Sequence, residues 1–115
     1  MTSEKLFKCS DKIIYFDMDG TLTKEAGLPD FENTSISEQS EFFKNATPNK
    51  EIIKLLNRIR RNNWVTIFTT RIDFHKDVTE EWLLKHNVRY DNIIFNKPYY
   101  DYFIDDKNLN PRDLE

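Results

Sequence analysis

The 115-residue sequence predicts a single α/β domain, residues 1–115, built on a mostly parallel sheet. Short apolar runs alternate with segments whose apolar residues recur at the period of a helix. Charged or hydroxyl residues follow these runs closely, as they do at the ligand-binding edge of an open parallel sheet. With 38% hydrophobic and 32% charged residues, the chain has the composition of a folded, soluble protein.

The first predicted strand covers residues 13–16, where two β-branched and two aromatic residues follow one another. Because the run contains no alternating polar residue, it predicts a strand buried on both faces. The strand leads into Asp17-Met18-Asp19-Gly20-Thr21, which places two carboxylates at its carboxyl end. Gly20 allows a sharp turn there at little steric cost. Asp17 and Asp19 are therefore candidates for chemistry rather than for packing.

Residues 22–46 have little apolar periodicity and are rich in Asn, Ser, Gly and Pro. We predict a flap or long loop in this stretch, with a helical turn near residues 38–44. The segment is too short for an independently folded domain. Since it buries little apolar surface to offset its ordering entropy, we also expect it to be mobile.

A helix is predicted to start with Thr47 as its N-cap and Pro48 at its first position, and to end at Asn62-Asn63. It carries a core-facing stripe at helical spacing: Ile52, Leu55, Leu56 and Ile59. Four cations fall mostly outside the stripe: Lys54, Arg58, Arg60 and Arg61. They are typical of a solvated helix face, and contacts to a phosphate backbone are the alternative.

The second strand is predicted at residues 64–69, and it runs into Thr70 and Arg71. A second helix follows over residues 73–86, and Asn87 is a plausible left-handed terminator. Its expected buried face carries residues four apart: Phe74, Val78 and Trp82. The two histidines of the chain, His75 and His86, are expected to lie on the helix surface.

Residues 93–95 form the third predicted strand, with Lys97 just beyond it, and residues 102–104 form the fourth, which ends in Asp105-Asp106. Right-handed crossovers between parallel strands would place helices on both faces of the sheet. The polar residues after all four strands would then meet at one edge and form a site.

This set of motifs resembles the haloacid dehalogenase-like (HAD) phosphatase superfamily over essentially the whole chain. Asp17-Met18-Asp19-Gly20-Thr21 is similar to its first motif, Thr69 to the second, Lys97 to the third and Asp105-Asp106 to the fourth. The resemblance implies a three-layer, Rossmann-like fold with strand order third–second–first–fourth. Too few residues separate the first two motifs for the family's cap domain, so residues 22–46 stand in its place. A response-regulator receiver is disfavoured because its acidic pair comes first.

The finer pattern resembles small, capless phosphatase-like proteins found with capsule and surface-polysaccharide genes. It consists of Thr69-Thr70-Arg71, Trp82-Leu83-Leu84-Lys85-His86, Lys97-Pro98 and Tyr102-Phe103-Ile104-Asp105-Asp106-Lys107.

The resemblance also implies roles for these residues. Asp17 would be the nucleophile and Asp19 the general acid and base, while Thr69, Thr70 and Lys97 would bind phosphoryl oxygens. Arg71 is left with two roles, a bidentate contact to substrate phosphate or carboxylate, or a structural salt bridge to Asp73.

A Mg²⁺ ion is expected to offset the repulsion among the carboxylates. The resemblance implies that Asp17, the backbone carbonyl of Asp19 and either Asp105 or Asp106 would bind it.

The predicted function is Mg²⁺-dependent hydrolysis of a phosphomonoester, through an aspartyl-phosphate intermediate, on a small metabolite such as a sugar phosphate or nucleotide. The alternatives are a nucleic-acid end-processing phosphatase and a catalytically silent partner subunit of HAD fold. A net charge of −3 argues against a nucleic-acid partner, and no apolar run is long enough to cross a membrane. With Cys9 as its single cysteine, the chain is expected to be cytoplasmic. Because no cap covers the site, a homo-oligomer is a further possible partner that would cover it.

Overall fold

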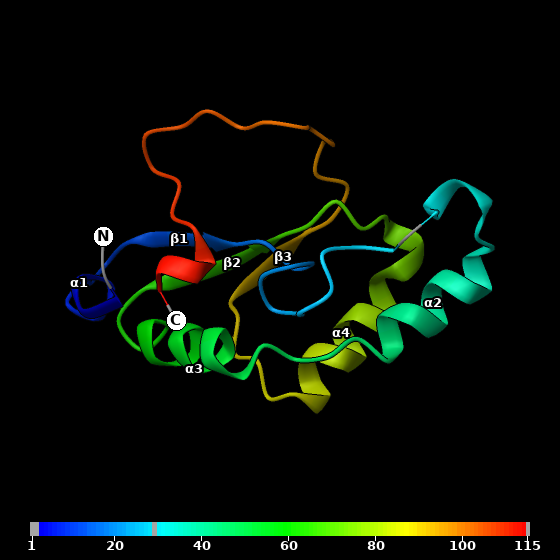
Figure 1. The fold of residues 1–115 in the computed structure, drawn as a ribbon. Helices are drawn as coiled ribbons and strands as arrows, with labels where there is room; N and C mark the ends of the chain where they lie inside the picture. The colour runs from blue at the N-terminus through cyan, green and yellow to red at the C-terminus, as the bar shows by residue number, and fades with distance from the viewer. Residues whose placement is uncertain (1–2, 29, 115) are drawn as a thin grey trace.

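The computed structural model describes residues 3–28 and 30–114 and is built around a three-stranded parallel sheet (Figure 1). The strands lie in the order β1-β2-β3, with Ile13 opposite Trp64 and Thr66 opposite Asn92. The α/β class with a parallel sheet is thereby confirmed, and the fold is Rossmann-like. The elements are β1 (Ile13–Phe16), β2 (Trp64–Phe68), β3 (Asn92–Ile94), α1 (Ser3–Phe7), α2 (Ile36–Lys44), α3 (Lys50–Ile59) and α4 (Lys76–Lys85), with 3-10 turns at Phe31–Asn33, Asp73–His75 and Pro111–Asp113.

The two crossover helices, α3 and α4, cover the same face of the sheet (Figure 1). Helices on both faces were predicted, and the strand order explains the difference. Two successive crossovers of the same hand that step in the same direction place their helices on one side. The core forms between that face and the helices, from Phe16, Val65 and Ile67 of the sheet, Ile52, Leu56 and Ile59 of α3, and Trp82 and Leu83 of α4.

The opposite face of the sheet is largely open, so the prediction that β1 is buried on both faces is wrong. Ile13 is 73% exposed, and Tyr15 and Trp64 are also exposed. Alternate residues of a strand point to opposite faces, and the described helices form a layer on only one of them. β1 is in addition an edge strand, because it pairs with β2 alone among the described residues.

The fourth strand predicted at residues 102–104 does not form. The chain arches away from the sheet between residues 98 and 110 (Figure 1), and Ile104 is 99% exposed. Tyr102 and Phe103 are exposed as well, so this apolar run gains no burial against the sheet.

α3 begins two residues later than predicted. Its N-cap is Asn49, whose side-chain oxygen accepts a hydrogen bond from the backbone N–H of Ile52 at 3.5 Å. Thr47 instead bonds to Glu25, through its backbone N–H and its hydroxyl, both at 2.8 Å. Asn caps a helix at least as well as Thr, so the competing contact of Thr47 decides between them. The predicted core stripe is confirmed, since Ile52, Leu55, Leu56 and Ile59 are all buried.

The second predicted helix starts as a 3-10 turn and becomes α-helical only at Lys76. The tighter turn changes which residues face inward. Phe74 is 66% exposed, whereas His75 and Trp82 are buried, so the predicted inward position of Phe74 is wrong. Asn87 has a φ of 58°, which confirms the left-handed terminator.

Residues 22–46 contain a longer helix than the single turn predicted there. Ser35 caps α2 by accepting a hydrogen bond from the Glu38 N–H at 3.1 Å, and its hydroxyl bonds to the Glu38 carboxylate at 2.9 Å. This reciprocal capping was readable in the sequence as Ser-x-x-Glu. α2 lies beside α4 (Figure 1) and buries Gln39 and Phe43. Pro29 lies outside the described residues, and the predicted mobility stays a prediction.

The amino-terminal stretch, expected to be a polar lead-in, includes the short helix α1, which buries Leu6 against the core. No helix in the described part of the chain is long and apolar enough to cross a membrane.

Candidate active site

The loop after β1 is anchored by its apolar residues, which leaves its carboxylates at the sheet edge. Met18 and Leu22 are fully buried, and the Met18 carbonyl accepts backbone hydrogen bonds from Thr21, Leu22 and Thr23 at 2.9–3.3 Å. Gly20 has a φ of 80°, and a Cβ there would meet the Ala26 backbone at 3.2 Å. A larger residue at this position would be strained by the positive φ and would require Ala26 to shift by a few tenths of an ångström.

Asp17 as a residue is exposed to solvent, but the protein partly desolvates its carboxyl and engages one of the two oxygens. Its Oδ1 accepts a hydrogen bond from the Met18 N–H at 2.8 Å, and no hydrogen bond to Oδ2 occurs among the described residues. Burial raises the pKa of Asp17, and the negative charge of Asp19 adds to the rise. The Met18 N–H, Lys97 and Arg71 oppose that rise in pKa. Asp17 is thus a carboxyl that is costly to ionise and lies within the field of two cations.

Asp19 is held by Arg71 in a two-point ion pair. Arg71 Nη2 lies 2.8 Å from Asp19 Oδ1, and Arg71 Nε lies 3.1 Å from Oδ2. Arg71 itself is only 4% exposed. Of the roles predicted for Arg71, the salt bridge to Asp73 does not form, because the carboxylate that it binds is Asp19.

The end of β2 is tied to the segment after β3 through the backbone. The Lys97 N–H donates to the Thr69 carbonyl at 2.9 Å, and the Thr69 hydroxyl accepts from the Arg71 N–H at 3.1 Å. Lys97 Nζ lies 5.1 Å from the ring centres of both Phe68 and Tyr100. Thr69 is buried, whereas Thr70 is exposed.

The structure therefore brings together five of the predicted site residues at the carboxyl edge of the sheet, namely Asp17, Asp19, Thr69, Arg71 and Lys97. Asp105 and Asp106 lie instead on the exposed stretch 98–110. No group of three or more His, Cys, Asp or Glu that could hold a metal forms among residues 3–28 and 30–114. The predicted cluster of four carboxylates is thus not assembled in this conformation.

His75 is the residue that sequence reasoning misplaced most clearly. It is only 1% exposed, and its ring lies 5.0 Å from that of Phe43. Nε2 lies 2.9 Å from Gln39 Oε1, and Nδ1 lies 3.2 Å from Ser40 Oγ. His86, by contrast, is half-buried against Trp82, with ring centres 4.3 Å apart. His75 thus joins α2 to the start of α4 beside Phe43, the residue whose ring contacts Arg71.

A pH dependence of stability follows from His75. Burial lowers its pKa below the usual 6.5, and the positive charge of Arg71 lowers it further. Below that usual value the unfolded chain binds a proton that the folded protein resists, so stability should fall as pH falls. We expect the melting temperature to drop less between pH 7.5 and 5.5 in His75→Gln than in the wild type. Equal drops in the two proteins would contradict a buried, neutral His75. The drop that remains in His75→Gln is expected to come from His86, whose pKa burial also lowers.

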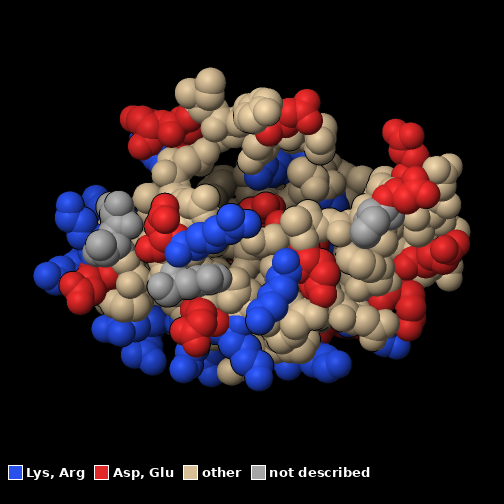
Figure 2. All heavy atoms as spheres, viewed as in Figure 1, with Lys and Arg blue, Asp and Glu red and all other residues tan. Residues whose placement is uncertain are grey.

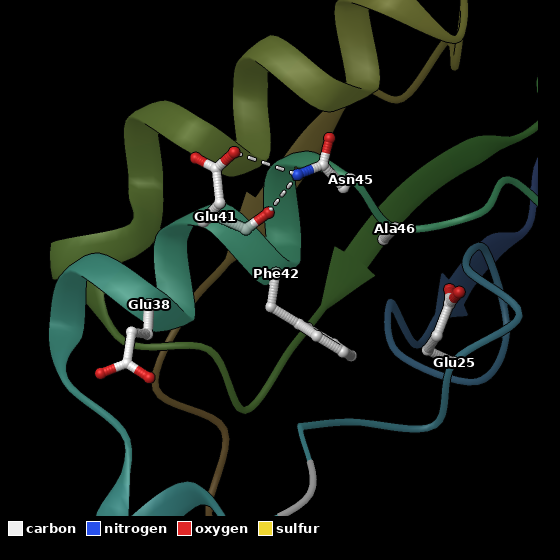
Figure 3. Close-up of a pocket in the computed structure, with 6 residues that line it drawn as sticks. All are labelled: Glu25, Glu38, Glu41, Phe42, Asn45 and Ala46. Carbon is white, nitrogen blue, oxygen red and sulfur yellow. Dashed lines mark hydrogen bonds between the residues drawn. The ribbon is translucent and has the colours of Figure 1, made fainter.

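A cavity of about 330 Å³ opens between α2 and the loop that carries Glu25 (Figure 3). Phe42 projects into this gap, and the other lining residues are Glu25, Glu38, Glu41, Asn45 and Ala46. Three carboxylates would repel an anionic phosphate. This cavity is therefore distinct from the candidate active site.

The surface carries mixed charges. Figure 2 shows Lys and Arg interspersed with Asp and Glu on the visible face. Two of the four cations predicted on this helix face have partners within the protein. Arg60, just after α3, pairs with Asp91 at 2.9 Å, and Arg58 lies 3.6 Å above the ring of Phe7. These contacts agree with a structural role for part of that helix face.

Comparison with known proteins places the fold among solved structures. A structural genomics target from Vibrio cholerae superposes with a TM-score of 0.65 and 28% identity, over 88% of this chain and 85% of that one. Chains of the Pnkp1/Rnl/Hen1 complex, described as an RNA repair complex, superpose with TM-scores of 0.58 and 0.57 at 20% identity. They match 82% and 85% of this chain, which spans only 28% and 32% of their length.

No family model and no curated protein matches the chain. At 20% identity, the likeness to the RNA repair complex shows a shared fold alone.

Proposed function

We propose that this protein is a phosphomonoester hydrolase of the HAD type that works through an aspartyl-phosphate intermediate. The observation that carries the proposal is the pair Asp17 and Asp19 on one anchored loop, with Lys97 and Arg71 contributing positive charge beside them. A carboxylate with one free oxygen next to cations suits attack on an anionic phosphoryl group.

In the proposed reaction, Oδ2 of Asp17 attacks phosphorus and the bond from phosphorus to the leaving oxygen breaks. For this step Asp19 must first take up a proton from solvent, which leaves one of its oxygens free to accept from Arg71. It gives that proton to the leaving oxygen, then takes a proton from the water that hydrolyses the aspartyl-phosphate, so phosphate leaves and both carboxyls are regenerated. Lys97 supplies positive charge to the phosphoryl oxygens, and Thr69 and Thr70 supply hydroxyl groups at the end of β2.

Mg²⁺ is part of the proposal. Such an ion is bound by hard oxygens, commonly one or two carboxylates together with water and substrate phosphate. Oδ1 of Asp17, the oxygen that does not attack, keeps a second lone pair beside its hydrogen bond from Met18, and with the backbone carbonyl of Asp19 it fits that donor set in kind. Bound there, Mg²⁺ would neutralise charge between nucleophile and phosphate. Whether Asp105 or Asp106 also binds it stays a prediction, because both lie on the exposed stretch 98–110, away from the site.

The proposed substrate is a small phosphorylated metabolite such as a sugar phosphate or nucleotide. Among the described residues of the segment 22–46, α2 is the only sizeable element in place of a cap. The sheet edge is therefore open, and a second copy of the chain would be one way to exclude water. The likeness to chains of an RNA repair complex favours a second candidate, an end-processing phosphatase that acts on nucleic-acid termini. The mixed surface charge weighs against that candidate.

Initial rates with three substrates test these candidates: p-nitrophenyl phosphate, glucose 6-phosphate and an oligonucleotide with a 3′-phosphate. We expect turnover of the first two to exceed that of the oligonucleotide. A preference for the oligonucleotide of about tenfold or more in kcat/KM would favour end processing, since that ratio corresponds to about 1.4 kcal/mol of transition-state binding. A protein inactive on all three would match a silent partner subunit.

A further inference from the structure

We propose that Arg71 is a positioning residue that holds the carboxylate of Asp19 in its working orientation, and that Phe43 of α2 holds Arg71 in turn. This inference rests on the proposed function and assigns Arg71 a role other than contact with the substrate. It also gives the segment between residues 22 and 46 a role in catalysis, because Phe43 of that segment supports Arg71.

The contacts of Arg71 leave little of its guanidinium for a substrate. Nε and Nη2 donate to the two carboxylate oxygens of Asp19 at 3.1 and 2.8 Å, and Nη1 donates to the Thr79 hydroxyl at 2.9 Å. Three of the five N–H groups of a guanidinium are thus used within the protein. A phosphate that sought the same two-point contact would have to displace Asp19.

The plane of the guanidinium is fixed as well. Its central carbon lies 3.9 Å from the ring centre of Phe43, which is a cation–π arrangement. Thr79 is fully buried on α4 and Phe43 is buried on α2, so Arg71 is held by contacts from two different helices. A two-point ion pair with a clamped guanidinium defines both the position and the plane of the carboxylate that it binds.

Phe43 is itself supported from behind. The His75 ring lies 5.0 Å from it, and His75 bonds to Gln39 and Ser40 of the same helix. α2 is therefore locked to the start of α4 at the level where its aromatic ring meets Arg71. Through Phe43 and Arg71, this packing reaches the proposed general acid and base.

The chemical consequence is specific to one step. A general acid matters most when the leaving oxygen is a poor leaving group, because such an oxygen cannot depart without a proton. Loss of positioning at Asp19 should therefore slow hydrolysis of an alkyl phosphate much more than hydrolysis of p-nitrophenyl phosphate. Loss of a phosphate ligand would instead weaken binding of every phosphate by a similar factor.

The experiment compares wild type with Arg71→Gln, Arg71→Lys and Phe43→Leu, using kcat/KM for glycerol phosphate and for p-nitrophenyl phosphate. We expect Arg71→Gln to lower kcat/KM about 10²-fold or more for glycerol phosphate and about tenfold or less for p-nitrophenyl phosphate. Phe43→Leu should shift the ratio of the two kcat/KM values in the same direction by about threefold to tenfold. The shift in Arg71→Lys should lie between those of Phe43→Leu and Arg71→Gln. The inhibition constant of inorganic phosphate should stay within about twofold.

Arg60→Gln is the matched control. Arg60 binds Asp91 with the same two nitrogens, at 3.2 and 2.9 Å, but near the start of β2 and thus at the opposite edge of the sheet. The Arg60→Gln substitution should leave the ratio of the two kcat/KM values unchanged. Thermal unfolding of each variant establishes that it is folded. If Arg71→Gln does not fold, the substrate ratio of Phe43→Leu still tests the proposal.

An unchanged ratio in Arg71→Gln and Phe43→Leu, or a rise in the phosphate inhibition constant equal to the loss in kcat/KM, would overturn the positioning role. A wild-type protein inactive on both substrates would instead overturn the proposed function itself.

Discussion

Replacing Asp17 with Asn is expected to abolish turnover of p-nitrophenyl phosphate, with kcat lower by more than about 10³-fold. An amide has no anionic oxygen to attack phosphorus, so the covalent intermediate cannot form. The substitution is nearly isosteric, and Asn can keep the acceptor oxygen that bonds to the Met18 N–H at 2.8 Å. The loss should therefore be one of chemistry rather than of folding.

A stability measurement makes this prediction sharper. Burial raises the pKa of Asp17, so at neutral pH the folded protein bears the cost of a partly desolvated carboxylate. Removing that charge should leave the melting temperature of Asp17→Asn equal to or above that of the wild type. The matched variant Asp101→Asn, on the exposed segment after β3, should keep wild-type turnover. Retained turnover in Asp17→Asn would contradict a nucleophilic Asp17.

The core of the candidate site was predictable because its signals are local. An apolar strand that ends in two carboxylates and a glycine specifies a turn at the sheet edge, and Gly20 has the positive φ that this turn requires. The α3 stripe was predictable for the same reason, since its spacing alone identifies the buried side.

Other features depend on contacts between distant segments and carry no local signal. His75 is buried because Gln39 and Ser40 of α2 meet it, although they are more than 30 residues away in sequence. The partner of Arg71 could not be chosen in advance, because Asp19 and Asp73 are chemically equivalent and only the turn geometry decides. Likewise, the open face of the sheet follows from strand order, which the apolar run of β1 does not encode.

Removal of divalent metal is expected to reduce activity below about 1% of the initial rate, and Mg²⁺ should restore it. Ca²⁺ should restore it poorly, because its larger and looser coordination would misplace the carboxylate of Asp17 relative to phosphorus. A readout independent of catalysis is available, since an ion that prefers the folded state must raise the melting temperature as its concentration rises. We expect that rise with Mg²⁺ in the wild type and a weaker one in Asp17→Asn.

The same titration addresses Asp105 and Asp106, which were predicted as ligands from the sequence. A higher Mg²⁺ concentration at half-saturation in Asp105→Asn or Asp106→Asn would mean that the stretch 98–110 closes onto the sheet edge when the ion binds. Unchanged titrations in both variants would mean that Asp17, the carbonyl of Asp19, water and substrate suffice, as the described conformation suggests. Full activity after exhaustive treatment with EDTA would rule out the metal altogether. In that case positive charge at the site would have to come from Lys97 and Arg71 alone, the two cations that already oppose the raised pKa of Asp17.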